Sequence, residues 1–202
     1  MLVIERDGGL GAALAQHGYE VDREGDPAAA RALVTAAPRP TLRLLAELEP
    51  EAWLATFREW TEEPFFAAQR FLRSAYQHGR GACWIAVTSI LGTQPFPGGG
   101  PAGAASIALH TLVRVAAIEG GPHGVRANVV AAGWREDAFP PGLDAQLAVE
   151  DTPARRLATE ADVAAAVAWL LSDDATHISG AVVTVDGGYT LTRGSRPDPA
   201  RD

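Results

Sequence analysis

Short apolar runs of strand length alternate with helical segments along this chain, and that alternation is what most restricts its fold. The six candidate strands are residues 1–5, 19–24, 41–46, 83–89, 125–131 and 181–185. Such alternation predicts a parallel sheet with helices on both faces and right-handed crossovers. At 202 residues the chain has room for one domain of this kind. We expect that domain to fill residues 1–192 and the polar residues 193–202 to form a disordered tail.

Helix signals separate these runs in the first half. Asp26 is placed as an N-cap with Pro27 at the first helical position, which predicts a helix that ends before Pro38. A longer helical pattern begins at Pro50, and Pro64 should kink or split it.

The second half of the sequence contains equally clear signals for loops and for the start of a helix. Residues 92–101 are rich in Gly and Pro and predict a loop. Residues 134–152 are polar and interrupted by Pro, which predicts a loop or lid. Thr159 and Asp162 have capping-box spacing and predict the start of a helix that ends near Leu171.

Two long ordered motifs lie in this half. Residues 124–133 read GVRANVVAAG, and residues 153–188 read PARRLATEADVAAAVAWLLSDDATHISGAVVTVDGG. The first resembles a strand and turn of the short-chain dehydrogenase/reductase family, with Ala132 in place of a proline. The second matches the C-terminal block of that family in order and spacing.

This resemblance implies a three-layer α/β fold, a Rossmann-like doubly wound parallel sheet. The segment between residues 24 and 50 is short for the family, so we expect one βα unit fewer than usual and a strand order of 2-1-4-5-6-7 in family numbering. The family's Asn-Asn-Ala-Gly turn should fall at residues 44–47, where the chain reads LLAE.

The family's reductases use Asn, Ser, Tyr and Lys, and the resemblance assigns a position here to each. Ser89 matches the serine. The tyrosine, the general acid, is replaced by Ala102, and the lysine is replaced by Ser106. Trp60 stands at the asparagine position. The chain contains no lysine at all, so this sequence looks like a family member that lacks the Tyr-x-x-x-Lys pair.

The phosphate loop of the family is also altered. Gly9 and Gly11 match its last two glycines and are the candidate cofactor-binding residues, but Glu5 replaces the first glycine and Asp7 adds a second negative charge. A carboxylate near a pyrophosphate is electrostatically unfavourable. We therefore expect no bound cofactor and regard NAD(P) as disfavoured.

Other residues could act in place of the missing ones. His110 follows Ser106 by one helical turn on the same face, so it could be a base near Ser89 or, as we favour, lie at a subunit interface. Asp137 could be a general base, although a solvated loop charge is the simpler interpretation. Phe96, Trp134 and Phe139 could line an apolar pocket.

Composition restricts the possible partners. A net charge of −8 argues against nucleic acid and anionic membranes. No histidine or cysteine spacing predicts a metal site, and the single cysteine, Cys83, should be a buried inert thiol. We see neither a signal peptide nor a membrane span, which predicts a cytoplasmic protein.

Three functions remain open. The first is a non-catalytic subunit that assembles with an active paralogue of the family, or with itself as a dimer or tetramer. The second is a non-redox enzyme on the same scaffold, such as a cyclase, isomerase or lyase acting on a small molecule with Ser89, His110 or Asp137. The third is an ordinary NAD(P)-dependent reductase, which requires a general acid that the sequence does not supply.

Overall fold

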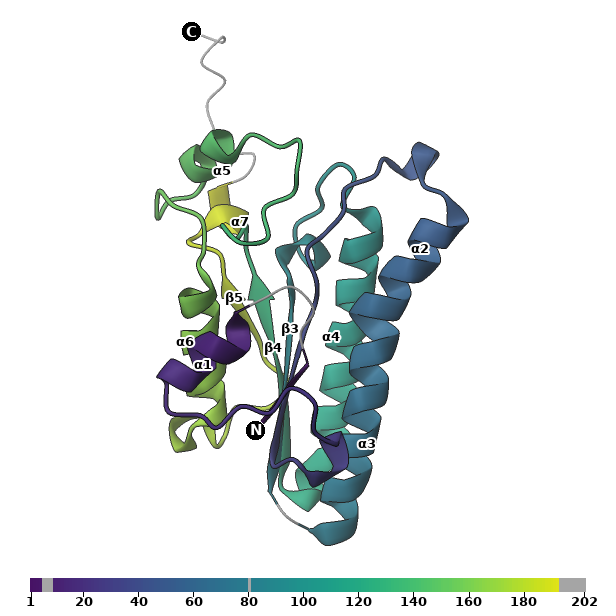
Figure 1. Ribbon diagram of the computed structural model, residues 1–202, viewed down its shortest axis with the longest axis vertical. Helices are drawn as coiled ribbons and strands as arrows, with labels where there is room; N and C mark the ends of the chain where they lie inside the picture. The colour runs from purple at the N-terminus through teal and green to yellow at the C-terminus, as the bar shows by residue number, and fades with distance from the viewer. Residues whose placement is uncertain (5–8, 80, 193–202) are drawn as a thin grey trace, which may run out of the picture.

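Five parallel strands form one sheet at the centre of the computed structural model, which describes residues 1–4, 9–79 and 81–192 (Figure 1). Each strand pairs in parallel with the next along the chain, in the order β1-β2-β3-β4-β5. Their bounds are β1 Leu2–Ile4, β2 Ala32–Ala36, β3 Ala82–Ser89, β4 Val125–Ala132 and β5 Val182–Val185. The central strands β3 and β4 are buried on both faces, as expected of a parallel sheet.

Helices cover both faces of this sheet, which confirms the three-layer prediction. On one side α3 (Glu63–His78) and α4 (Gly100–Gly120) pack against the face that carries Trp84. On the other side α1 (Leu10–Gln16) and α6 (Glu160–Leu171) pack against the face that carries Ile85. Alternate residues of β3 therefore supply two separate cores.

The first half of the chain differs from its prediction at three places. Residues 19–24 make only a single bridge, between Asp22 and Leu2, so the sheet has five strands and not six. Residues 32–36 form strand β2 and not a helix, because the turn capped by Asp26 ends after Ala29 and the β-branched run that follows pairs with β3. Residues 41–46 contain no strand; a 3₁₀ turn, Leu45–Glu47, lies there.

The predicted long helix is split, as the proline at its middle suggested. Helix α2 (Pro50–Phe57) leads into a π-helical turn, Arg58–Glu62, and α3 begins directly before Pro64. Trp60 and Thr61 in the turn are buried, whereas α2 has no buried residue at all. A π turn inserts one residue into the helical repeat, so the two segments present different faces to the core.

The predicted lid contains a helix of its own. Asp144 caps α5 (Ala145–Asp151) by accepting the backbone N–H groups of Gln146 and Leu147. The capping box at the start of α6 is confirmed, since the Thr159 and Asp162 side chains each accept the other's backbone N–H. A last short helix, α7 (Tyr189–Thr192), follows β5. The predicted tail, residues 193–202, lies outside the described residues.

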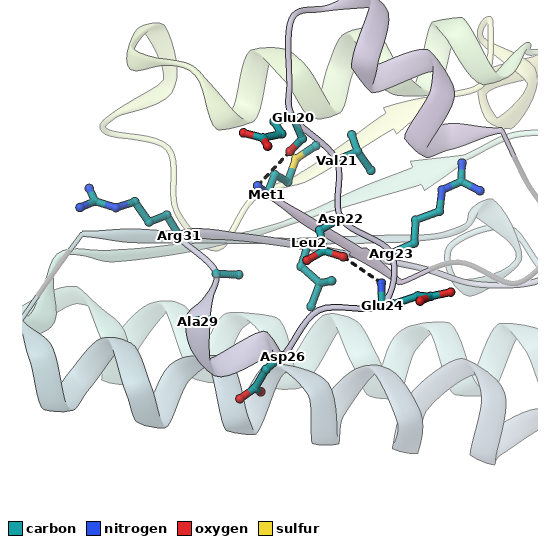
Figure 2. Close-up of a pocket in the computed structure, with 11 residues that line it drawn as sticks. Met1, Leu2, Glu20, Val21, Asp22, Arg23, Glu24, Asp26, Ala29 and Arg31 are labelled. Carbon is teal, nitrogen blue, oxygen red and sulfur yellow. Dashed lines mark hydrogen bonds between the residues drawn. The ribbon is translucent and has the colours of Figure 1, made fainter.

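A large hollow lies outside β1, where the Asp22 bridge continues the sheet (Figure 2). Its volume is about 840 Å³, and Glu20, Asp22, Glu24 and Asp26 line it, with Arg31 at its rim. Met1 and Arg31 directly precede β1 and β2, so the hollow is at the amino ends of the strands. Ligands of open α/β sheets bind at the carboxyl ends, so we do not place the functional site here.

The segment Gly100–His123, which contains α4, is long and apolar enough to cross a membrane by composition. The expectation that no stretch is so apolar was therefore wrong. Half of its most apolar window is buried inside the protein, where Leu109 and Val113 contact the sheet. Core helices pass the same test of length and composition, so the segment is weak grounds for a membrane span.

Candidate functional site

The carboxyl ends of β3 and β4 form the candidate site. Ser89 is the last residue of β3 and lies opposite Ala132 in the sheet register. Its hydroxyl accepts the backbone N–H of Leu91 at 3.2 Å and so caps the 3₁₀ turn Ile90–Gly92. Ser89 is thus where the sequence placed it, and the hydroxyl has a structural bond of its own.

Helix α4 passes beside this point, and the two positions that the family resemblance assigns to the tyrosine and lysine face inward. Ala102 is 2% exposed and Ser106 is fully buried. The Ser106 hydroxyl has no hydrogen-bond partner among the described residues. Neither position offers a proton donor of the strength of a tyrosine activated by a lysine.

Aromatic side chains fill the space above the strand ends. Trp134 makes edge-on contacts with Phe96, Phe139 and Tyr189, with ring centroids 5.2, 5.9 and 5.9 Å away. We call these four residues, with Trp60 and Ala102 of the same core, the aromatic cluster. Phe96, Trp134 and Phe139 do come together as expected, but they pack on one another.

The cavity that remains beside Ser89 is small. It measures about 30 Å³ and is bounded by Thr88, Ser89, Trp60 and Trp134. That volume suits a water molecule, whereas a nicotinamide ring needs several times more. A nicotinamide ring would therefore fit in this cavity only if the side chains that bound it moved.

His110 is not brought together with Ser89. Its Nε2 is 2.8 Å from the Thr88 hydroxyl, and neighbouring strand residues point to opposite faces. The histidine is 2% exposed within its own chain, so the interface that we favoured is wrong. Burial, with a smaller contribution from Arg114, lowers the pKa of His110 from 6.5 to about 4.

Acid should therefore destabilise the protein through His110. Above pH 6.5 the residue is neutral whether folded or unfolded; between pH 6.5 and 4 only the unfolded chain takes up the proton. We expect the free energy of unfolding to fall across that window by up to about 1.4 kcal/mol per pH unit. Urea denaturation of wild type and His110→Gln at pH 7.5, 6 and 5 measures this, with His17→Gln as control. Equal losses in wild type and His110→Gln would contradict it.

Asp137 is held in an ion pair. Arg135 donates to both of its carboxylate oxygens, from Nε at 3.0 Å and from Nη2. The guanidinium of Arg39 also donates to the Asp137 backbone carbonyl. The carboxylate would have to give up Arg135 before it could serve as a base, so the geometry does not favour that role.

The glycine turn before α1 makes an unexpected contact with a distant side chain. The N–H of Gly9 donates to Glu160 Oε1 at 2.5 Å, a contact across 151 positions of sequence. A Cβ at position 9 would lie 2.2 Å from Glu160 Oε2, so a larger residue there would displace this carboxylate from its present position. Gly11 is buried in the first turn of α1. Glu5 and Asp7 lie outside the described residues.

No local pattern pointed to Glu160, which appeared only as part of the capping-box segment. The turn after β2 was also placed wrongly. Since β2 ends at Ala36, the counterpart of the family's Asn-Asn-Ala-Gly turn is residues 37–40, which read APRP, and not residues 44–47.

Cys83 lies in the core away from this site. Its Sγ contacts the Leu170 carbonyl at 3.8 Å, and burial raises the pKa of the thiol to about 11. A thiol with so high a pKa is a poor nucleophile at neutral pH. Among residues 1–4, 9–79 and 81–192 no cluster of His, Cys, Asp and Glu suits a metal ion.

Comparison with known proteins settles the family. A family profile described as enoyl-(acyl carrier protein) reductase matches residues 32–190. The chain belongs to the short-chain dehydrogenase/reductase family. It is 34% identical over 149 residues to cis-4-hydroxycyclohexanecarboxylate dehydrogenase of Sinomonas cyclohexanicum, covering 72% of this chain and 59% of that protein. It is also 35% identical over 146 residues to Protein FixR of Bradyrhizobium diazoefficiens, covering 70% of this chain and 50% of that protein.

Solved structures of the family agree with the fold. An oxidoreductase of the short-chain dehydrogenase/reductase family from Burkholderia thailandensis superposes with a TM-score of 0.82 at 25% identity, covering 94% of this chain and 92% of that one. The chain nevertheless spans only about half to three-fifths of the length of the curated relatives it matches.

These relatives contradict the expectation that no cofactor binds. Gluconate 5-dehydrogenase from Burkholderia cenocepacia, which shares this fold at a TM-score of 0.79 and 23% identity over 94% of this chain and 85% of that one, was solved with NADP and tartrate. The curated relatives include named dehydrogenases and reductases. NAD(P) is therefore the cofactor class of this family, and our argument from the glycine loop was wrong to discount it.

The described residues offer such a cofactor one backbone donor, the Gly9 N–H, in a hollow that Glu136, Asp137 and Glu160 also line. The Gly9 N–H already holds an anionic oxygen, that of Glu160, as it would hold a phosphate oxygen. At the other end the cavity of about 30 Å³ beside Ser89 does not admit a nicotinamide ring while Trp60 and Trp134 remain in place.

Proposed function

We propose that this chain is a short-chain dehydrogenase/reductase relative that has lost hydride transfer and serves as a non-catalytic subunit beside an active family member. NAD(P), which supplies or accepts hydride in this family, is the nucleotide class that we propose for Gly9. The observation that carries the proposal is the inward-facing pair Ala102 and Ser106, which offers no general acid where the family has one.

The first test is turnover. The purified protein, with NADH or NADPH and a panel of ketones, keto acids and 3-oxoacyl thioesters, should oxidise no reduced nucleotide above the rate of a Ser89→Ala control. Nucleotide fluorescence in the same samples reports binding separately from turnover. Steady oxidation that Ser89→Ala abolishes would overturn the proposal and favour an ordinary reductase.

The alternative of a non-redox enzyme gains no support from the site. His110 is bonded to Thr88, and Asp137 is paired with Arg135. Neither presents a free base to Ser89, whose own hydroxyl caps a turn.

The helical surface supports the part of the proposal that concerns assembly. Helix α2 has the apolar sequence PEAWLATF and yet buries no residue. Trp53 and Leu54 of α2, Phe66 of α3, and Ile107 and Ile118 of α4 are large apolar side chains that are 38–77% exposed. Exposed apolar side chains at this density are typical of a surface that a partner covers.

Leu54→Glu should abolish association with the active subunit. A buried charge at the centre of an apolar interface costs several kcal/mol, so we expect the dissociation constant to rise by about 100-fold or more. Native mass spectrometry after co-expression with a family member that keeps Tyr-x-x-x-Lys, from the same organism, measures the complex. Leu147→Glu, at an exposed apolar position of α5, is the matched control. A chain that forms only homo-oligomers would rule out the active partner.

A further inference from the structure

Helix α2 forms an apolar surface that the rest of the described chain leaves uncovered. None of its residues is buried, and Figure 1 shows the helix on the outer side of α4. Trp53 is 38% exposed and Leu54 is 62% exposed. The 3₁₀ turn before the helix adds Leu45, which is 71% exposed. We call Leu45, Trp53 and Leu54 the α2 surface, and its apolar character fits a place where another molecule binds.

Carboxylates flank the α2 surface along the sequence. Residues 44–63 contain six glutamates and one arginine, a net charge of −5, while the whole chain has −8. Glu47, Glu49 and Glu51 are exposed, and none of the three forms an ion pair within residues 1–4, 9–79 and 81–192. The apolar side chains are therefore bordered by negative charge that the described part of the chain does not neutralise.

This charge selects among the molecules that an apolar surface can bind. A second copy of the chain, related by a two-fold axis, would place the same glutamates against one another, and like charges across an interface oppose association. An anionic membrane is repelled for the same reason. The end of the chain, residues 193–202, reads RGSRPDPARD and has no large apolar side chain to offer. What fits is another protein whose apolar side chains are bordered by arginine or lysine.

We propose that the α2 surface docks an apolar face bordered by arginine or lysine on a different protein, and that its glutamates exclude a second copy of this chain. The apolar contacts supply most of the affinity, and the opposite charges supply specificity and a faster association rate. The inference rests on the proposed function in taking that protein to be the active subunit. The preference for basic side chains is a property of this chain alone, so it can be tested without that subunit.

Two helical peptides of about 18 residues, or five turns, test the preference. Both carry leucine on one face, and this face is bordered by arginine in one peptide and by glutamate in the other. In the ¹⁵N-labelled full chain, the arginine peptide should shift the Trp53 indole resonance with a dissociation constant about 10-fold lower than that of the glutamate peptide, at about 50 mM NaCl. At about 500 mM NaCl the difference should shrink to about 2-fold, because salt screens exposed charges.

Trp169 is the internal control for this titration. It is 43% exposed on α6, across the sheet from the helices that lie beside α2, so neither peptide should shift its indole resonance. A shift of Trp169 as large as that of Trp53 would show that the arginine peptide binds to the acidic protein without preference for α2, which would overturn the inference.

Glu47→Gln combined with Glu49→Gln removes two charges and keeps the size of both side chains. The double variant should bind the arginine peptide about 3- to 5-fold more weakly and the glutamate peptide more tightly than wild type does. Glu24→Gln combined with Asp174→Asn is the matched control. It removes two charges at exposed positions outside the α2 surface, in the hollow beside β1 and in the turn after α6, and should leave both affinities unchanged.

The possible results separate this inference from the proposed function. Equal affinities for the two peptides, or no shift of Trp53 by either, would overturn the inference and leave assembly with the active subunit to its own test. A homodimer at about 50 mM NaCl that Leu54→Glu dissociates, measured by sedimentation, would overturn it in favour of a second copy. A chain that prefers the arginine peptide but forms no complex with an active family member would overturn the proposed function alone.

Discussion

Trp134→Ala should lower the free energy of unfolding by about 3–5 kcal/mol, the usual cost of removing a large buried aromatic side chain. The indole is 6% exposed and makes three edge-on aromatic contacts. Its loss leaves a cavity that Phe96 and Phe139, held on separate loops, cannot both fill. Urea denaturation followed by circular dichroism measures the change.

Trp169→Ala is the matched control for this variant. Trp169 is 43% exposed on α6, so the same truncation there should cost about 1 kcal/mol or less. A loss below about 1 kcal/mol at Trp134 would show that the aromatic cluster is loosely packed and that the cleft beside Ser89 opens readily.

Restoring the family's residues should fail. The double variant Ala102→Tyr with Ser106→Lys should not reduce any carbonyl and should lose about 3–5 kcal/mol of stability. Position 106 is fully buried, so a lysine there would lose its hydration without a carboxylate partner. Ala102 is itself part of the aromatic cluster and is 2% exposed, so a phenol at this position would have to displace its neighbours. Stability by urea denaturation and NADPH oxidation are measured on the same preparation.

Ser106→Ala is the control for the double variant, because it changes position 106 without introducing a charge or a larger side chain. The Ser106 hydroxyl is buried and has no hydrogen-bond partner in the described part of the chain, so its removal should be neutral or should stabilise the protein by about 1 kcal/mol. A double variant that is as stable as wild type and that reduces a ketone would show that the site is only two side chains away from an active reductase.

The sequence predicted the second half of the fold well because its signals there are local. Strand β4 and the capped start of α6 each follow from a few neighbouring residues. The first half was harder because its strand β2 lies in a segment that an N-cap and a proline also favour as helix. Pairing with β3 and β1 decided between the two, and pairing of distant segments is not visible in a single sequence.

In the candidate site, too, some features could be predicted from the sequence, and those that depend on contacts between distant residues could not. The family resemblance assigned Ala102 and Ser106 to the tyrosine and lysine positions, and the structure places both on the inner face of α4. The hydrogen-bond partner of His110 could not be identified from the sequence, because it depends on the direction in which the Thr88 side chain points. The contact of Glu160 with Gly9 joins residues 151 positions apart and has no counterpart in any local motif.

The π-helical turn between α2 and α3 joins the interior of the cleft to the outer surface. One extra position within a helix rotates the residues before it by about 100° relative to those after it. Trp60 in this turn belongs to the aromatic cluster, while Trp53 and Leu54, up to two turns earlier, face outward. The same five-residue turn therefore sets both the packing of Trp60 inside the protein and the direction in which Trp53 and Leu54 face outside it.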